Sequence, residues 1–274
     1  MLGNVQAELI KASRRPASWL LLTVGLVLNL LFAYLIPYAG YAGGTEGAPN
    51  SDRGLPAMLP DRFIGNAIGG LPVFVGALAL IFGVLVVGSE YGSETWKTVL
   101  AQGPSRLKVY AAKLVAIAAG VLGLVVALFG VSSAASAVIA ALEDQAMNWP
   151  PVWDVFVGIG AGWLVTMMWA FLGVLLAIAL RGVALPIGLG LVWLLAVQNL
   201  LAAIAAPLVD WIAEMQKGLP GPNAGSLVAS LGAAGDTPGV ADLVGGGQAT
   251  LVLTAYLLSF AAVGGWLLSR RDIL

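Results

Sequence analysis

Two apolar runs flank a polar segment in the N-terminal half of the chain: FVGALALIFGVLVV at residues 74–87, GSEYGSETWKTVLAQGPSR at residues 88–106 and LVAIAAGVLGLVVALFG at residues 114–130. A helix needs about 20 apolar residues to cross the hydrocarbon core of a bilayer. The runs approach that length, and they lack the alternation of membrane barrel strands. This stretch therefore predicts two membrane helices joined by a polar loop.

The composition extends this interpretation to the whole chain. Of the 274 residues, 59% are hydrophobic and 10% are charged, and the mean hydropathy is +0.94. Soluble domains carry about 25% charged residues. We expect an all-α integral membrane protein with one membrane domain over residues 1–274, because no polar segment is long enough to form a core of its own.

Six apolar segments are candidate spans. They are Ser18–Tyr38, Ile68–Gly88, Val109–Val138 (which is overlong), Val155–Leu180, Val183–Ala206 and Thr250–Leu268. The first has an alternative interpretation as a signal peptide, but its apolar stretch exceeds the typical length of about 7–15 residues.

The basic residues predict the orientation of the spans. With both termini inside, ten of the 13 lysines and arginines lie in inner segments. These are Lys11, Arg14, Arg15, Lys97, Arg106, Lys108, Lys113, Arg181, Arg270 and Arg271, and the outer segments hold Arg53, Arg62 and Lys217. Cytoplasmic loops carry such an excess of positive charge, so we expect both termini in the cytoplasm.

Several kinds of chemistry are disfavoured. The sequence has no cysteine and no histidine, and no lysine follows glycine as a phosphate-binding loop requires. VGGGQ at residues 244–248 resembles the signature of ATP-binding cassettes, but it stands alone and on the predicted outer side. No charged residue lies near the middle of a span, which argues against an intramembrane enzyme, a proton-driven antiporter or a charged channel. A net charge of −1 implies no nucleic-acid partner.

Mild polar residues do lie within the spans. They are Asn29, Thr166, Gln198 and Asn199, with Ser132, Ser133 and Ser136. Hydrogen bonds between helices are the ordinary role of such groups; the alternative is that Asn29, Thr166, Gln198 and Asn199 line a translocation route. GNAIG at residues 65–69 and GIGAG at residues 158–162 contain GxxxG, which predicts close helix packing within the chain or between subunits.

Two segments outside the spans have helical patterns. Residues 1–16 place Leu2, Val5, Leu9 and Ile10 on one face, which predicts an amphipathic helix on the membrane surface; a disordered leader is the alternative. In the outer segment 207–249 we expect short extracellular helices near the membrane surface before the last span; an irregular loop is the alternative.

The polar segment has helix-end signals of its own. Ser93 can cap a short helix, ETWKTVLAQ at residues 94–102, and Gly103 and Pro104 end it. Trp96, Val99 and Leu100 would anchor this helix. Glu90, Glu94 and Lys97 would face water or a partner.

The stretch EYGSETWKTVLAQGPSRLKVYAAKL, residues 90–114, resembles the first cytoplasmic loop of ABC type-2 permeases, the membrane subunits of bacterial export-type ABC transporters. The matching positions are Glu90, Thr95, Lys97, Leu100, Pro104, Ser105, Arg106 and Lys113. Glu94 departs from the family, which often has glycine before the threonine. The C-terminal LLSRRDIL is also typical of the family.

The resemblance implies a permease subunit in a bacterial cytoplasmic membrane. The loop at residues 89–105 would be a coupling helix that binds a separate ABC ATPase through Glu90, Glu94, Thr95, Trp96, Lys97, Leu100 and Arg106. ATP and magnesium would be held by that ATPase, and this chain would need no cofactor of its own. A second permease copy, identical or homologous, would complete the transporter within the membrane lipid.

The implied substrate is amphipathic: a peptide antibiotic, a drug or a lipid-like molecule, as in permeases of the bacitracin or lantibiotic-immunity kind, which are linked to antibiotic resistance. The alternative is a non-transporting scaffold or sensor subunit that recruits a cytoplasmic partner. An intramembrane enzyme is the third hypothesis, and the missing histidine, cysteine and buried carboxylates weigh against it.

Overall fold

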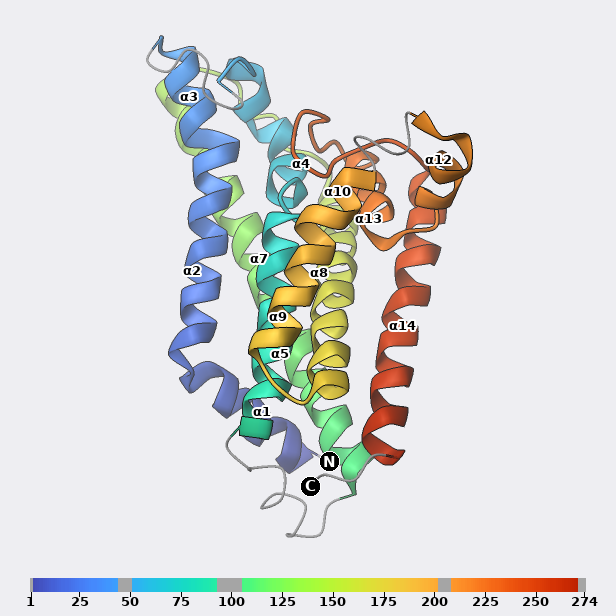
Figure 1. Cartoon of the computed structure of the whole chain (residues 1–274). Helices are drawn as coiled ribbons and strands as arrows, with labels where there is room; N and C mark the ends of the chain where they lie inside the picture. The colour runs from blue at the N-terminus through green and yellow to red at the C-terminus, as the bar shows by residue number, and fades with distance from the viewer. Residues whose placement is uncertain (1, 44–50, 93–104, 202–207, 271–274) are drawn as a thin grey trace.

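The structure is a computed structural model that describes residues 2–43, 51–92, 105–201 and 208–270. Within those residues every regular element is a helix. Five helices are long and apolar enough to cross a membrane, which confirms the predicted all-α, multi-pass class. Figure 1 shows them as a bundle whose long members run from end to end of the molecule.

Five of the six predicted spans have a helix of membrane length. The first is a continuous helix formed by α2 (Pro16–Leu30), a π-helical turn η1 (Leu31–Leu35) and α3 (Ile36–Tyr41). The others are α5 (Phe74–Gly92), α7 (Arg106–Leu142), α8 (Val152–Leu180) and α14 (Gly246–Arg270).

The predicted fifth span corresponds to a shorter helix. It consists of α9 (Ala184–Leu191), a π-helical segment η4 (Val192–Val197) and α10 (Gln198–Leu200). The rest of the predicted span, residues 202–207, lies outside the described residues. The count of six spans therefore stays a prediction.

The second span starts later than its hydropathy suggested. Residues 63–68 form a separate short helix, α4 (Phe63–Ile68), and α5 begins only at Phe74. Between them lie Gly69, Gly70 and Pro72, and glycine and proline weaken a helix interior. The short 3-10 helices η2 (Leu55–Met58) and η3 (Pro60–Arg62) precede α4.

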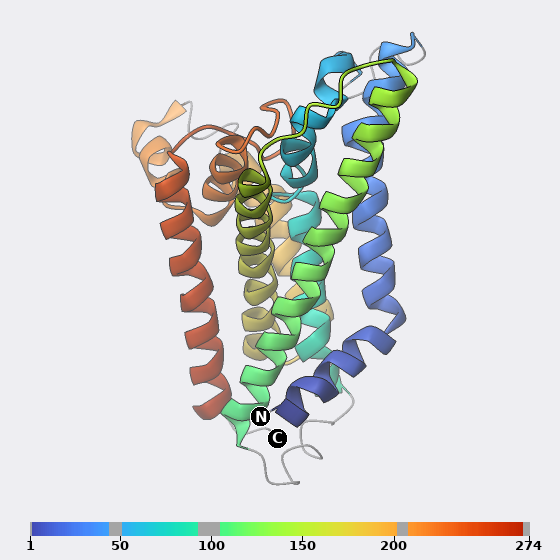
Figure 2. The ribbon, with the colours of Figure 1, turned by 180° about the vertical axis from the view of Figure 1, so that it is seen from behind.

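At the centre of the bundle, α5 and α8 pack with their backbones in contact. A Cβ added at Gly83 would collide with the Ala170 carbonyl, and one added at Gly173 with the Leu80 carbonyl. Small residues allow this close approach of membrane helices. α14 packs on the other side of α8, as Figures 1 and 2 show.

α7 crosses the bundle obliquely (Figure 2). It has 37 residues, so at 1.5 Å per residue it is about 55 Å long. Near its far end, Glu143 accepts hydrogen bonds from the Tyr38 hydroxyl at 2.7 Å and the Tyr41 hydroxyl at 3.2 Å. Midway, the Ser132 hydroxyl donates to Asn29 Oδ1 at 2.9 Å. Between these two levels the Ser136 hydroxyl donates to the Tyr34 hydroxyl at 3.1 Å, so α7 is bound to the first membrane helix at three levels.

Two short helices precede the last membrane helix, as the sequence predicted. They are α12 (Asp210–Gln216), with an exposed Trp211, and α13 (Pro220–Ala229). Nearly all residues of α13 are buried among neighbouring elements. Its small residues fit between neighbours, and the Asn223 amide donates to the Lys217 and Leu219 carbonyls at 2.7 Å. The position of both helices near a membrane surface stays a prediction.

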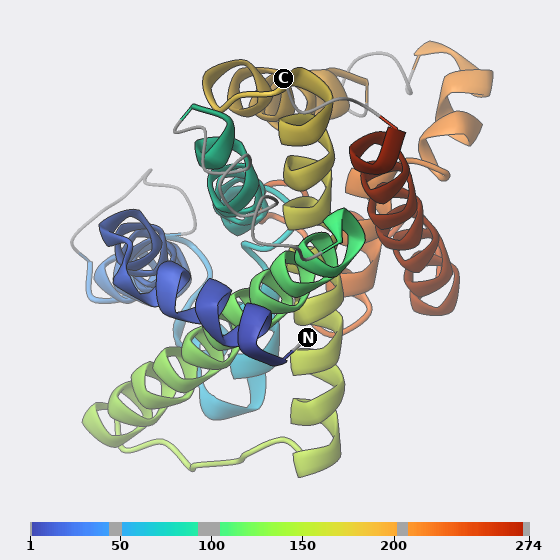
Figure 3. The same ribbon diagram turned by 90° about the horizontal axis from the view of Figure 1, so that it is seen from below.

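The N-terminal residues form α1 (Leu2–Arg14), a helix as predicted. Figure 3 shows α1 lying across α7 at the end of the bundle, and the described end of α14 lies at the same end of the molecule. The placement of α1 on a membrane surface stays a prediction. We call this end of the molecule the terminal end and the opposite one the loop end.

Candidate functional site

Four charged side chains from three helices meet at the terminal end. Lys113 Nζ of α7 lies 2.9 Å from Glu8 Oε2 of α1 and 2.7 Å from Glu90 Oε1 of α5. Lys11 Nζ of α1 lies 2.9 Å from Glu8 Oε1 and 3.1 Å from Glu90 Oε1. We call these four residues the ion cluster. It joins α1 to both α5 and α7.

Because most of its charged groups are buried, the ion cluster has a large effect on the stability of the protein. Lys113 has no exposed surface, and Glu90 and Glu8 are 3% and 7% exposed. Removing the two carboxylates and the Lys113 ammonium group from water is costly, and their pairing offsets that cost. The Lys11 side chain is 37% exposed and lies at the edge of the cluster. The two positive and two negative charges balance, so loss of any one member leaves an uncompensated charge in a poorly hydrated site.

The charges of α1 respond to these neighbours. Burial by itself raises the pKa of Glu8, but the Lys113 charge and hydrogen bonds from Lys11 and Lys113 outweigh it, and the net pKa is lowered. Burial lowers the pKa of Lys11, but hydrogen bonds and charge from Glu8 and Glu90 prevail and raise it. Both groups are therefore ionised at neutral pH.

The ion cluster borders the segment that the sequence analysis singled out. Glu90 lies in the last turn of α5, and Lys113 lies two turns into α7, so the two residues flank residues 93–104 from both sides. Arg15 adds a second tie, since its Nη1 donates to the Leu85 carbonyl of α5 at 2.8 Å. Displacement of either end of the segment would thus be transmitted to α1.

Only two of the predicted coupling residues, Glu90 and Arg106, lie among the residues that the structure describes. Glu94, Thr95, Trp96, Lys97 and Leu100 lie outside the described residues. Arg106 is the half-buried first residue of α7. The expectation that Glu90 faces water or a partner is wrong, because its carboxylate is buried against Lys113 and Lys11. The role of these residues in coupling stays a prediction.

Lys113 is the residue whose role in the cluster the sequence analysis missed. The sequence placed it only among the inner basic residues and at a position that matches the permease loop. The available signal was its position: a lone lysine follows Ala111 and Ala112 and precedes an apolar run, so its helix face is otherwise apolar. A lysine in such surroundings needs an acidic partner, and Glu8 and Glu90 lie in the neighbouring helices.

The comparison with protein families decides the assignment. The model of the ABC-2 family transporter proteins matches residues 4–197, which include all four members of the ion cluster. The chain belongs to the ABC-2 family. It is therefore a membrane component of ABC transporters, a family whose members act together with an ABC ATPase. No curated protein sequence matches the chain.

The predicted route residues of this ABC-2 family protein are separated in the structure. Asn29 lines a cavity of about 260 Å³ between α2, α4 and the segment at residues 234–238. Its amide donates to the Asn66 carbonyl at 2.8 Å. At the rim, Arg53 forms a bidentate pair with Asp236, with hydrogen bonds of 2.8 Å and 2.7 Å. That pairing lowers the pKa of Asp236.

Gln198 and Asn199 line a different cavity of about 310 Å³, beside α13. The Gln198 side-chain oxygen accepts from the Gly221 N–H at 2.7 Å, so this residue also binds α10 to α13. Thr166 is buried, and its hydroxyl donates to the Gly162 carbonyl of its own helix at 2.8 Å. The hydrogen bonds of these residues are of the ordinary packing kind, and a transport role for them stays a prediction.

Both GxxxG sequences make contacts within the chain. Gly65 lies against the Gly232 carbonyl, and Gly158 lies near Ile64 and Phe129. Gly162 approaches Leu71 and Val125. Close packing within one chain therefore accounts for these glycines.

Proposed function

We propose that this ABC-2 family protein is the permease subunit of an exporter that moves an amphipathic substrate with energy from a separate ABC ATPase. The terminal end would face the cytoplasm of a bacterial cell, where the ATPase holds ATP and magnesium. A second permease copy, identical or homologous, would complete the route. The excess of lysine and arginine at the terminal end supports this orientation.

One observation carries the proposal: the ion cluster joins α1 to the two helices, α5 and α7, that precede and follow residues 93–104 in the sequence. The ATPase would bind that segment, and closure around ATP would displace the adjoining ends of α5 and α7. Because Lys113 holds Glu8 at 2.9 Å and Glu90 at 2.7 Å, α1 would move together with those ends. Through the ion cluster, a displacement of residues 93–104 would shift α1, α5 and α7 together.

The test uses the double variant Glu94→Gln/Trp96→Ala, reconstituted in vesicles with the cognate ATPase. We expect loss of ATPase association and of substrate-stimulated hydrolysis, while the permease remains folded. The matched control is Glu214→Gln/Trp211→Ala, which removes a glutamate and a tryptophan from exposed positions of α12 at the loop end. The control should retain both properties.

Two results would contradict the proposal. If association and stimulated hydrolysis survive the first double variant, the segment does not couple. If the ATPase binds but vesicles accumulate none of the candidate peptide, drug or lipid-like substrates, the chain is a scaffold or sensor that recruits the ATPase without transporting.

A further inference from the structure

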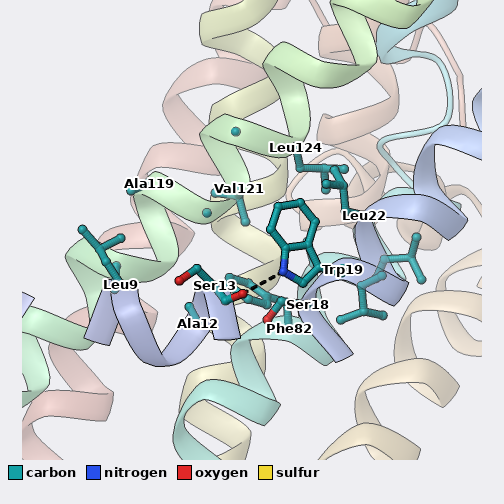
Figure 4. A pocket seen from close by; sticks show the side chains of 16 residues that line it. Leu9, Ala12, Ser13, Ser18, Trp19, Leu22, Phe82, Ala119, Val121 and Leu124 are labelled. Carbon is teal, nitrogen blue, oxygen red and sulfur yellow. Dashed lines mark hydrogen bonds between the residues drawn. The ribbon is translucent and has the colours of Figure 1, made fainter. Parts of the chain in front are cut away.

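A cavity of about 340 Å³ lies where α1 meets the first membrane helix, one turn along α7 from the ion cluster. Its walls come from α1, α2, α5 and α7. Figure 4 shows the Trp19 indole of α2 reaching toward α1, with its N–H aimed at the Ser13 carbonyl. The exposed Trp19 and Gly123 mark its opening toward the outside of the bundle.

The chemistry of the walls suits a hydrocarbon. Leucine, alanine, valine, glycine and phenylalanine form most of the lining. Trp19 Nε1 already donates to the Ser13 carbonyl at 2.7 Å, and the Ser13 hydroxyl donates to the Ile10 carbonyl at 3.0 Å. The Ser18 hydroxyl is the one further polar side-chain group among the described lining residues, so the cavity offers a guest few hydrogen-bond partners. A lining of this kind favours apolar molecules over polar ones.

The size of the cavity indicates the length of the guest. An apolar cavity of about 150 Å³ holds one benzene ring. By proportion, 340 Å³ accommodates roughly a dozen carbon atoms. That is most of one fatty acyl chain, whereas a compact polar solute would find few hydrogen-bond partners there.

The charge beside the cavity indicates the headgroup. Glu8 is neutralised within the ion cluster, so α1 presents a net positive charge from its last turn. Arg14 follows the lining residue Ser13 and is exposed, and no hydrogen bond or ion pair to a described residue engages its guanidinium. Basic residues at a membrane surface attract anionic lipids.

We propose that this cavity holds one acyl chain of an anionic phospholipid from the leaflet at the terminal end, with its phosphate at Arg14. The lipid would occupy the angle between α1 and α2 as a resident part of the protein. This site is independent of the ATPase and of the transported substrate, so it stands or falls separately from the proposed function.

Two glycines of α7 provide a matched pair of variants. A side chain added at Gly123, which lines the cavity, meets nothing within 4 Å, and the same holds for Gly130, which does not line it. Gly123→Leu therefore fills the cavity, and Gly130→Leu adds the same side chain to the same helix elsewhere. Ala119→Leu, at another exposed lining position, is a second filling variant.

The experiment incubates the purified full chain in detergent with phosphatidylglycerol or phosphatidylcholine and counts retained lipids by native mass spectrometry. We expect one phosphatidylglycerol per chain in the wild type and in Gly130→Leu, and at least a tenfold loss in Gly123→Leu and Ala119→Leu. Arg14→Gln should abolish the preference for phosphatidylglycerol over phosphatidylcholine.

Three results overturn the proposal. They are equal retention by the filling variants and the control, retention of detergent alone by the wild type, and equal retention of both lipids by the wild type. Circular dichroism of each variant identifies any that fails to fold; if Gly123→Leu does, Ala119→Leu decides the result.

Discussion

Lys113 places a full positive charge where its helix is otherwise surrounded by apolar groups. It is fully buried, and its ammonium group contacts Glu8 and Glu90. Such a residue is stable only while its partners remain, because a buried charge without compensation costs several kcal/mol. The stability of the protein should therefore depend more on Lys113 than on any single apolar contact around it.

Replacing Lys113 by Met tests this dependence. The variant leaves Glu8 and Glu90 with Lys11 alone, and we expect a loss of about 3 kcal/mol of stability, measured as the denaturant midpoint in detergent. Lys108→Met is the control, since Lys108 is exposed on the same helix, and it should be nearly neutral. Equal effects of the two substitutions would show that the ion cluster does not stabilise the protein.

The ion cluster also predicts a pH dependence. The pKa of Glu8 is lowered from 4.5, so its contribution is fully present above pH 4.5 and is lost as pH falls through the folded-state value. The pKa of Lys11 is raised from 10.5, so its contribution is present below pH 10.5 and is lost above the folded-state value. We expect the difference in melting temperature between wild type and Glu8→Gln to be constant between these limits and to shrink below pH 4.5. A difference that persists at pH 3 would contradict the ionic role of Glu8.

At the scale of helices, the glycines between α5 and α8 set how closely the two backbones approach. Gly173 lies against the Leu80 carbonyl, and Gly83 lies against the Ala170 carbonyl. In both contacts the neighbouring atom belongs to the backbone, so no flexible side chain could move aside to make room. The pair of helices is therefore intolerant of any added carbon at these two positions.

The matching substitution is Gly173→Val. We expect it to separate α5 from α8 and to destabilise the protein by about 3 kcal/mol, seen as lower folded yield and a lower melting temperature. Gly160→Val is the control on the same helix, because a Cβ there meets nothing within 4 Å. Comparable loss in both variants would mean that helix propensity, rather than packing, is responsible.

Hydropathy was enough to predict the long helices but not the short buried ones. Five spans follow from apolar runs alone, because crossing a bilayer requires a minimum length. The break at Gly69 and Gly70 lies inside an apolar run, so hydropathy did not reveal it. α13 has a mixed composition typical of loops, and its burial depends on partners distant in sequence. The Gly221 N–H donates to the Gln198 side chain, and the Ser226 hydroxyl donates to the Ala241 carbonyl.

The candidate site was predictable only in outline. Caps and turn residues located the segment at residues 93–104, and the resemblance gave it a role. The pairing of Glu8 with Lys113 joins residues 105 positions apart, and no periodicity within a single segment contains that information. Glu90 was misplaced for the same reason, since its partner on α1 lies 79 positions away.

For the whole molecule, the distribution of positive charge predicts which end faces the cytoplasm. Because the sequence has no cysteine, single cysteines report position directly. Gln145 and Ser105 are exposed and lie just beyond opposite ends of α7. We expect a membrane-impermeant maleimide to label Gln145→Cys in intact cells and Ser105→Cys only after lysis. The reverse pattern would invert the proposed orientation.

α1, the first membrane helix and α7 are connected to one another in a closed triangle, which restricts their relative motion more than side-by-side packing does. α1 and the first membrane helix share one corner covalently, at Arg15 and Pro16. The Glu8–Lys113 pair fixes α1 to α7, and Glu143 fixes α7 to Tyr38 and Tyr41 at the loop end. Because each of these three elements is connected to the other two near its ends, none can slide along another unless one of these connections breaks. The first and third spans are therefore expected to move as one rigid frame, together with the end of α5 that Glu90 binds to it, rather than bending helix by helix.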